Sequence, residues 1–490
     1  MPTPAAKPPT GPKPAPSENS VVQKVDWADF RDHLSTADQE GHRMWVYPRK
    51  PAGRFHRARA WLSALLLLVM FGGPFVRING EPLLMMNVVD RQFVILGQTF
   101  WPQDAVILAI GLLVFLTGIA VFTAAFGRLW CGWLCPQTVL MEMVFRKIEY
   151  FIEGDASEQR ALDRAPWTAA KTLRKLAKHG AFLALSFLVG NTLLAYIIGT
   201  DALYRIVTDN PANHLAGLAF MVLFTLLFYG IFARFREQAC TFICPYGRFQ
   251  STLLDENSIV VAYDFKRGEQ RGILRRQQSA EARHAAGRGD CIDCHQCVSV
   301  CPTGIDIRNG TQMECVHCTA CIDACDHVMD KIAKPRGLIR YASLDGIQRG
   351  EKRLKITPRL VGYSVLLVAL IGLECFLLFN RTAVDTTLLR APGSLYQQMP
   401  EGKIGNLYTV KLINKTGREI AVELRLENAE GNLRILGREL RVPPRELTQS
   451  SVLIEIDRTR LKPGNTPLVV GVYQGSERLQ TIKTGFIGPR

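Results

Sequence analysis

Eight cysteines in the middle of the chain have the spacing of metal-cluster ligands. They form two runs with the pattern C-x2-C-x2-C-x3-C, which is the spacing of bacterial [4Fe–4S] ligands. In such pairs of runs the fourth cysteine of each run binds the cluster of the other run, whereas zinc sites use C-x2-C pairs with longer spacers. The spacing therefore predicts two clusters, the first held by Cys291, Cys294, Cys297 and Cys325, and the second by Cys315, Cys318, Cys321 and Cys301.

Four more of the 13 cysteines belong to a repeated motif. FGRLWCGWLCP at 126–136 and FREQACTFICP at 235–245 share the pattern F-x4-C-x3-C-P. Proline suits the first position of a helix, so the second cysteine of each motif should lie at a helix N-terminus. There the helix dipole and the nearby Arg128 and Arg248 should favour the thiolate form.

These four cysteines admit three kinds of chemistry. They can bind copper, because thiolate selects Cu(I) over harder ions, they can hold a third iron–sulfur cluster, or they can cycle as a dithiol. A copper or redox-thiol site is the leading hypothesis, and a further cluster is the alternative. If the four cysteines have no chemical role, they simply pack in the protein interior. The candidate catalytic residues and copper ligands are Cys131, Cys135, Cys240 and Cys244.

Other candidate residues have weaker signals. His295, His317 and His327 lie among the cluster cysteines, where we expect them to form hydrogen bonds near sulfur or solvent and tune the potential rather than ligate iron. Glu374 and Cys375 fall within an apolar segment. A carboxylate there predicts either a proton path or a polar contact near a helix end, and the role of Cys375 stays open.

Five apolar segments are long enough to span a bilayer, namely 60–78, 104–126, 181–200, 214–233 and 359–379. Basic residues concentrate before the first segment and in the connections 127–180 and 234–358, whereas 79–103 and 201–213 carry one arginine each. The positive-inside rule then predicts a cytoplasmic N-terminus and an external C-terminus, with the cysteine runs in the reducing cytoplasm. This topology suits a bacterial inner membrane with the last domain in the periplasm.

One external connection has an unusual composition. Residues 79–103 are largely apolar, so we expect them to lie on the membrane surface with Trp101 as an interfacial anchor. Met85 and Met86 are candidate soft ligands for copper at that face, although contact with lipid or protein is the more frequent role of such a pair.

The length of 490 residues allows about three domains. The net charge is +15, and the basic residues lie beside the apolar segments. This arrangement indicates a membrane protein rather than a nucleic-acid binder. Short alternating stretches in 400–490 predict an immunoglobulin-like β-sandwich of about seven strands, which contains no Cys or His and should act in docking.

The predicted fold is a five-helix transmembrane domain with an inserted cytoplasmic ferredoxin-type domain and a C-terminal sandwich. Residues 1–20 are rich in proline and should be disordered. The expected divisions are an N-terminal segment at 1–59, helices one to four at 60–254, the ferredoxin-type domain at 255–358, helix five at 359–380 and the sandwich at 395–490.

With these motifs the chain resembles the cytochrome c oxidase accessory protein family, called CcoG, FixG or RdxA. The resemblance rests on RMWVYPRKPAGRF at 43–55, both C-x3-C-P motifs, the double cysteine run and the C-terminal domain. It implies assembly of a cbb-type haem–copper oxidase and cupric reductase activity, with electrons from the clusters reducing Cu(II) to Cu(I). It also implies a cytoplasmic electron donor and oxidase subunits or copper chaperones as partners, besides the lipid bilayer, and allows a homo-oligomer.

Two other functions stay open at this point. The NapH and NosR electron-transfer proteins also combine C-x3-C-P motifs with ferredoxin-type cysteines, although the C-terminal sandwich favours the CcoG family. A respiratory subunit that exchanges electrons with quinone would turn over quinol and ignore Cu(II). A non-catalytic scaffold for oxidase assembly would keep its function when a cluster ligand is replaced.

Overall fold

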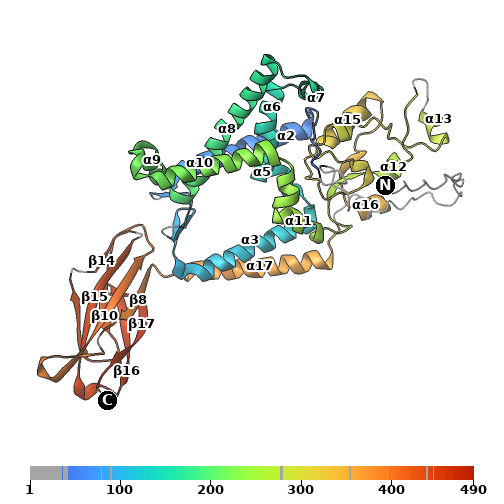
Figure 1. The fold of residues 1–490 in the computed structure, drawn as a ribbon. Coiled ribbons are helices and arrows are strands. Elements are labelled where there is room, and N and C mark those ends of the chain that lie inside the picture. Colours follow the sequence, from blue (N-terminus) through green and yellow to red (C-terminus); the bar gives the residue numbers. More distant parts are fainter. Residues whose placement is uncertain are drawn as a thin grey trace, which may run out of the picture.

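The structure is a computed structural model of the chain. It describes residues 36, 42–78, 80–88, 91–275, 280–351, 355–393, 395–437, 440–444 and 446–489. The segment 1–20, which the sequence predicts to be disordered, lies outside the described residues. Figure 1 shows the cysteine-rich domain and the β-sandwich at opposite ends of a set of long helices.

Within the described residues, five helices are long and apolar enough to span a membrane. They are α2 (Arg54–Gly72), α3 (Ala105–Phe126), α8 (Ala169–Ile198), α10 (Leu215–Gly230) and α17 (Pro358–Phe379). The number agrees with the sequence prediction, and the chain is a multi-pass membrane protein. Helix α8 begins well before the predicted residue 181, because Thr168 caps its N-terminus by accepting the N–H of Lys171 and the basic first turns are helical too.

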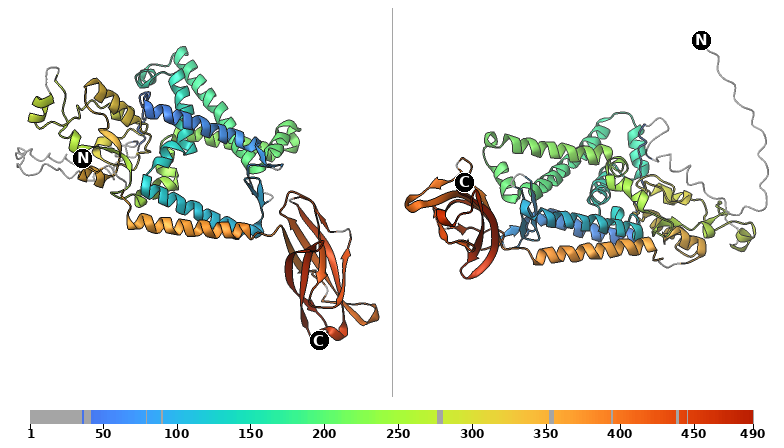
Figure 2. Two further views of the ribbon diagram at one scale, coloured as in Figure 1. Left: turned by 180° about the vertical axis from the view of Figure 1, so that it is seen from behind. Right: turned by 90° about the horizontal axis from the view of Figure 1, so that it is seen from below.

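The long helices form two groups. Helices α2, α8 and α10 pack together through an apolar cluster that includes Phe182, Val189 and Phe232. Helices α3 and α17 lie side by side along their length, as Figures 1 and 2 both show. The two C-x3-C-P motifs follow α3 and α10, so each motif continues from a different group.

Short helices connect the long ones on the side of the cysteine-rich domain (Figure 1). After α3 come α4 (Leu129–Trp133), α5 (Pro136–Leu140), the π-helical turn η3 (Met141–Phe145), α6 (Arg146–Ile152) and α7 (Ala156–Arg164). After α10 come two more π-helical turns and a helix, namely η5 (Ile231–Phe235), η6 (Ala239–Ile243) and α11 (Pro245–Leu253). One π-helical turn follows the first motif, and the other two precede and lie within the second. Such turns are rare and concentrate at functional sites, so they support a functional role for this region.

The connection between α2 and α3 forms small antiparallel sheets. A turn η1 (Gly73–Phe75) leads to β1 (Arg77–Ile78), β2 (Glu81–Pro82), β3 (Leu84–Asn87), β4 (Gln92–Ile95), β5 (Gln98–Phe100) and η2 (Pro102–Asp104). The prediction that Trp101 is an exposed interfacial anchor is wrong, because its side chain is only 8% exposed. Between α8 and α10 lie α9 (Thr200–Thr208) and η4 (Pro211–Asn213).

The cysteine-rich domain lies between α11 and α17 and is closed by its first and last strands. Strand β6 (Val260–Tyr263) pairs antiparallel with β7 (Ile339–Ala342), so the chain enters and leaves the domain side by side. The other elements are α12 (Phe265–Gly268), α13 (Ala280–Ala285), α14 (Gln296–Ser299), η7 (Ile307–Asn309), α15 (Ala320–Lys331) and α16 (Leu344–Arg349). The apolar core of this domain contains the cysteines themselves.

The C-terminal domain is an antiparallel β-sandwich. One sheet has the order β13-β15-β10-β8 with β9 paired to β10, and it faces the sheet β12-β16-β17. The strands are β8 (Val384–Arg390), β9 (Gln397–Gln398), β10 (Lys403–Asn414), β11 (Ile420–Ala421), β12 (Glu423–Leu426), β13 (Gly431–Leu436), β14 (Arg441–Val442), β15 (Leu447–Asp457), β16 (Asn465–Gln474) and β17 (Glu477–Ile487). Strand β8 precedes the boundary expected at residue 395, so the sandwich begins directly after α17.

A buried ion-pair cluster joins the sandwich to the helices. Asp104 at the start of α3 accepts hydrogen bonds from Arg381 at 2.7 Å and from Lys415 at 2.6 Å. Arg381 follows α17 and Lys415 follows β10, so one carboxylate ties together α3, α17 and the sandwich. Removing one partner of a buried ion pair costs about 3–5 kcal/mol of stability, so these pairs hold the sandwich against the helices.

Candidate functional site

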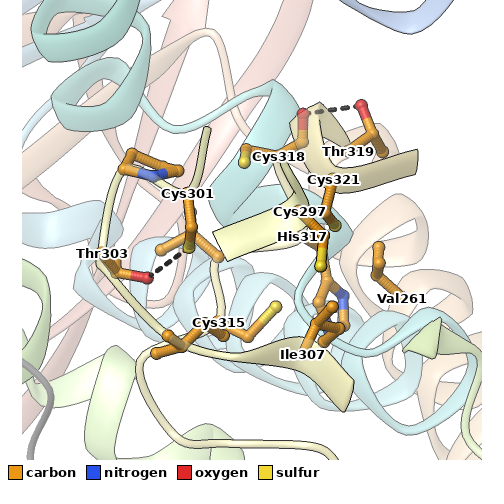
Figure 3. Close-up of a pocket in the computed structure, with 13 residues that line it drawn as sticks. Val261, Cys297, Cys301, Thr303, Ile307, Cys315, His317, Cys318, Thr319 and Cys321 are labelled. Atoms are coloured by element: carbon orange, nitrogen blue, oxygen red, sulfur yellow. Dashed lines mark hydrogen bonds between the residues drawn. The ribbon is translucent and has the colours of Figure 1, made fainter. Parts of the chain in front are cut away.

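The eight cysteines of the double run line two adjacent cavities. The first cavity is lined by Cys291, Cys294, Cys297 and Cys325. The second cavity is lined by Cys301, Cys315, Cys318 and Cys321, with Cys297 also at its wall (Figure 3). The structure thus brings together the same two sets of four that the spacing predicts.

The loops around both cavities repeat one backbone conformation. In each run the residues directly before and after the second cysteine are left-handed, with φ near 52–65° at Asp293, His295, His317 and Thr319. Non-glycine residues adopt this conformation rarely, and it bends the chain tightly enough for three thiols of one loop to face one cavity. The same bend occurs in both runs, so the two cavities are built alike.

Burial keeps these thiols protonated in the absence of a metal. It raises the pKa of Cys297, Cys315 and Cys325 to about 12 and that of Cys318 to about 11. A metal centre replaces such protons outright, because thiolate is the ligand form. Eight thiols that line two cavities, seven of them buried or partly buried, fit the donor set of two [4Fe–4S] clusters.

His317 lies at the wall of the second cavity (Figure 3). Its Nδ1 accepts the main-chain N–H of Arg128 at 3.1 Å, which assigns the ring proton to Nε2. Nε2 is buried and has no hydrogen-bond partner within the described chain. Burial, followed by the charge of Arg128, lowers the pKa of His317 to about 3, so the ring is neutral.

Of the other two candidate histidines, His295 lines the first cavity and His327 lines neither. His295 is 61% exposed and lies 3.3 Å from Asp293, and its Nδ1 lies 2.9 Å from Arg308. His327 lies on α15, outside both sets of cavity-lining residues. Neither arrangement makes these residues iron ligands.

The four cysteines of the C-x3-C-P motifs also come together, and we call them the membrane-edge thiols (Cys131, Cys135, Cys240 and Cys244). The charges of Cys131, Cys135 and Cys244 act on the pKa of Cys240, and the charges of Cys135 and Cys244 act on the pKa of Cys131. The four thiols therefore lie near one another. Pro136 and Pro245 occupy the first turns of α5 and α11, as the sequence predicts. All four thiols are partly buried and none forms a disulfide.

The helix that follows the second motif contacts a thiol of the first. Gln250 of α11 donates its Nε2–H to Sγ of Cys131 at 3.0 Å. Burial raises the pKa of Cys131 to about 11 and that of Cys240 to about 12. These two thiols therefore also need a metal to become thiolates.

The first motif packs directly against the loop of the second cavity. A Cβ placed on Gly132 would lie 2.4 Å from the main-chain oxygen of Val316 and 2.6 Å from that of His317. Nε1 of Trp133 donates to Oη of Tyr341 at 3.1 Å, and that hydroxyl lies 3.5 Å from the oxygen of His317. The membrane-edge thiols and the second cavity are thus joined by main-chain contact.

Two buried arginines lie at this junction. Nε of Arg59 donates to the oxygen of Gly132 at 2.6 Å, and the charge of Arg59 acts on Cys318. Arg128 donates from Nη1 to the oxygen of Met313 and from Nη2 to that of Gly247 at 3.0 Å. The charges that act on Arg128 include Cys131, Cys315 and Glu314.

Among the described residues no three His, Cys, Asp or Glu side chains converge closely enough to hold one metal ion. This holds for the membrane-edge thiols and equally for the eight cavity cysteines. In this structure, therefore, no three of the predicted copper ligands are already placed to bind one ion. Met85 and Met86, the other soft candidates, lie in β3 with their side chains in successive, opposed positions of the strand.

Glu374 lies in α17 beside α3. Its Oε1 is 3.3 Å from the position that a Cβ on Gly111 would take, and its Oε2 is buried without a partner in the described chain. Cys375 is exposed on the same helix. Glu374 thus faces the contact between the two helices, away from the cysteine sites.

Comparison with known proteins gives a family. Protein RdxA of Cereibacter sphaeroides is 37% identical over 401 residues, which cover 79% of this chain and 83% of RdxA. Nitrogen fixation protein FixG of Rhizobium meliloti is 32% identical over 471 residues, covering 85% and 87%. The chain belongs to the FixG/RdxA family.

Family descriptions match the three parts of this FixG/RdxA member. Residues 235–344 match a "4Fe-4S dicluster domain", residues 108–152 match a "4Fe-4S binding domain" and residues 375–489 match the "IG-like fold at C-terminal of FixG". The structure titled FixG-related protein from Vibrio parahaemolyticus is 22% identical and covers 22% of this chain, with a TM-score of 0.19. The protein is an iron–sulfur electron-transfer protein of the membrane with an immunoglobulin-like domain.

Sequence reasoning missed several residues of the site. Arg59 is visible in the sequence only as one member of a basic stretch before the first span, and Gln250 carries no motif. Tyr341 lies near the end of the cysteine-rich domain, far in sequence from Trp133. Their roles come from contacts between distant segments, which spacing within a motif does not encode.

Proposed function

We propose that this FixG/RdxA member is a cupric reductase, an oxidoreductase that carries electrons from two cytoplasmic clusters to the membrane-edge thiols. The observation that carries the proposal is the packing of the first C-x3-C-P motif against the loop of the second cavity, at Gly132 and His317. The two sets of cysteines are adjacent parts of one buried structure, so electrons need not cross solvent between them.

The cluster ligands in this proposal are the lining residues of the two cavities. The first cluster is assigned to Cys291, Cys294, Cys297 and Cys325, and the second to Cys301, Cys315, Cys318 and Cys321. When bound, such clusters accept and release single electrons at potentials set by burial and by hydrogen bonds to sulfur. His317 suits this second influence, because its buried Nε2–H lies at the cavity wall without another acceptor.

The proposed order of the sites follows from exposure. Cys294 is exposed, whereas the other seven cavity cysteines are buried or partly buried. The first cavity is therefore the one that a cytoplasmic electron donor reaches most directly. The second cavity lies between it and the membrane-edge thiols, so we propose that electrons enter at the first and leave through the second.

Copper is proposed as the final acceptor, taking one electron as Cu(II) becomes Cu(I). Soft thiolates at the membrane edge would stabilise the Cu(I) product over the Cu(II) substrate. The resemblance to the CcoG family supports a use of this product in assembling a cbb-type oxidase, with oxidase subunits or copper chaperones as partners. The N-terminus and cysteine-rich domain would then be cytoplasmic and the sandwich periplasmic, in line with the distribution of basic residues.

The test is an anaerobic assay of Cu(II) reduction by the purified protein with a chemical one-electron reductant. We expect replacement of all four membrane-edge thiols by serine to abolish Cu(I) formation while the iron of the two cavities remains. Cys375→Ser, at an exposed position on α17, is the matched control and should keep full activity. Wild-type protein that oxidises a quinol but does not reduce Cu(II) would refute the proposal in favour of quinone chemistry.

A further inference from the structure

We infer that the four membrane-edge thiols hold a third [4Fe–4S] cluster. The inference rests on the proposed function for the electron path and keeps the membrane-edge thiols as the last redox site. It replaces one part of that proposal, because thiols that ligate a cluster do not ligate copper, so Cu(II) would take its electron from the cluster. The argument rests on the donor set, on a buried amide and on two buried arginines.

The donor set is complete for one cluster. Four thiols are the ligand set of a [4Fe–4S] cluster, and each motif supplies two of them. No three of these side chains converge closely enough to hold a single metal ion.

The family match at 108–152 points the same way. That segment matches a "4Fe-4S binding domain", yet the only cysteines in it are Cys131 and Cys135. Two thiols do not complete a cluster. Cys240 and Cys244, contributed by the second motif, supply the missing pair, because the fold brings the four together.

A buried amide donates a hydrogen bond to one of the thiols. The side chain of Gln250 is fully buried, and its Nε2 donates to Sγ of Cys131 at 3.0 Å. The Nε2–H is thus held beside Cys131, where it can stabilise a ligand sulfur. An N–H donated to a ligand sulfur is also a known means of setting cluster potentials.

Two buried cations lie at the site. Arg59 and Arg128 are 3% and 5% exposed, and their hydrogen bonds go to main-chain oxygens. The charges of Cys131, Cys315 and Glu314 act on Arg128, whereas Arg59 forms no ion pair within the described residues. Buried charges in proteins are paired or lie beside metal groups. A cluster with four thiolates is an anion, and these arginines lie between the membrane-edge thiols and the second cavity, where anionic groups on both sides would balance them.

The experiment is iron and acid-labile sulfide analysis of the full-length protein purified without oxygen. We expect about twelve iron atoms per chain in the wild type and about eight after replacement of all four membrane-edge thiols by serine, a loss of about four. Cys375→Ser should retain about twelve. Electron paramagnetic resonance of the dithionite-reduced protein should lose one of three cluster signals in the quadruple variant.

About eight irons in the wild type, unchanged in the quadruple variant, would overturn the inference, even if that variant folds poorly. Copper bound at about one per chain and lost with the four thiols would overturn it in favour of a copper site. A wild type with about twelve irons that does not reduce Cu(II) would uphold the third cluster and refute the proposed function instead.

Gln250 provides a second measurement. Gln250→Leu keeps the volume of the side chain and removes the N–H donated to Cys131, so the reduction potential of the third signal should become more negative while its iron is retained. Thr252→Ala, at an exposed position of the same helix α11, is the matched control and should leave that potential unchanged. A potential that Gln250→Leu does not shift would contradict the placement of the cluster beside Cys131.

Discussion

The main-chain N–H of Arg128 donates a hydrogen bond of 3.1 Å to Nδ1 of His317, between residues 189 positions apart in the sequence. Arg128 follows the helix α3 within the first C-x3-C-P motif, and His317 lies between two cysteines of the second cavity. The bond fixes the imidazole with its remaining N–H at that cavity. A membrane helix and a cluster loop thereby share one hydrogen-bonded contact.

Gly132→Ala tests whether the packing of the first motif against the loop of the second cavity serves electron transfer. A Cβ at Gly132 would lie within 2.4–2.6 Å of two main-chain oxygens, so the first motif must move away from the loop of the second cavity. We expect the iron content of both cavities to be kept and the rate of Cu(II) reduction to fall by roughly tenfold to a hundredfold. The measurement is the stopped-flow rate of Cu(I) formation.

The matched control for Gly132→Ala is Gly180→Ala in α8. No atom lies within 4 Å of a Cβ at Gly180, so the substitution adds a methyl group in open space. Its rate should equal that of the wild type. A wild-type rate for Gly132→Ala as well would mean that the contact is dispensable for electron transfer.

Glu149→Gln tests the buried ion pairs beside the π-helical turns. Glu149 accepts two hydrogen bonds from Arg236, at 3.0 and 2.8 Å, and lies 3.5 Å from Lys178. Loss of the carboxylate leaves Arg236 buried without that partner, which should cost about 3–5 kcal/mol of the free energy of unfolding at pH 7. Thermal unfolding in detergent would measure this.

The effect of Glu149→Gln should depend on pH. Burial by itself raises the pKa of Glu149, but Arg236 and Lys178 outweigh it and bring the pKa below its ordinary value. A lowered carboxyl pKa stabilises the fold fully above the unfolded pKa of about 4.3, and this stability is lost as the pH falls through the folded pKa. The difference between variant and wild type should therefore shrink only below about pH 4.

Glu423→Gln is the control for this pH dependence. Its partner Arg425 and Glu423 itself are 52% and 62% exposed, so the pair is largely solvated. The substitution should change the stability by less than about 1 kcal/mol at any pH. An equal loss for Glu149→Gln and Glu423→Gln would contradict the importance given to the buried pairs.

Lys415→Met tests the joint between the sandwich and the helices. It removes one of the two cations bound to Asp104 and leaves Arg381 as the other. We expect faster amide hydrogen exchange in β8 and at the end of α17, because the joint loses a buried pair worth about 3 kcal/mol. Lys411→Met, at an exposed position of β10, should leave the exchange unchanged.

The elements that carry periodic or motif signals could be predicted from the sequence. The five spans, the cysteine sets of the two cavities and the helices that begin at Pro136 and Pro245 follow from local patterns. Strand β8 escaped prediction because a threonine, Thr386, occupies one of its buried positions and hides the alternation. Trp101 was misjudged because an aromatic residue beside an apolar segment has the composition of an interfacial anchor, whereas tertiary packing buries it.

The contacts between distant segments could not be predicted. Arg59 reaches Gly132 across 73 positions and Gln250 reaches Cys131 across 119. Such pairs depend on how α2 and α11 pack around the first motif, and a single sequence contains no periodicity that reports this. The sets of cysteines were local patterns, but the groups that surround them are products of the tertiary fold.

The long helices separate into two groups, and the membrane-edge thiols come from both. Cys131 and Cys135 continue from α3, which is paired with α17, and Cys240 and Cys244 continue from α10, which packs on α8. Asp104 couples the sandwich to α3 and α17, the group that carries Cys131 and Cys135. The distances among the four thiols therefore depend on how the two helix groups pack against each other.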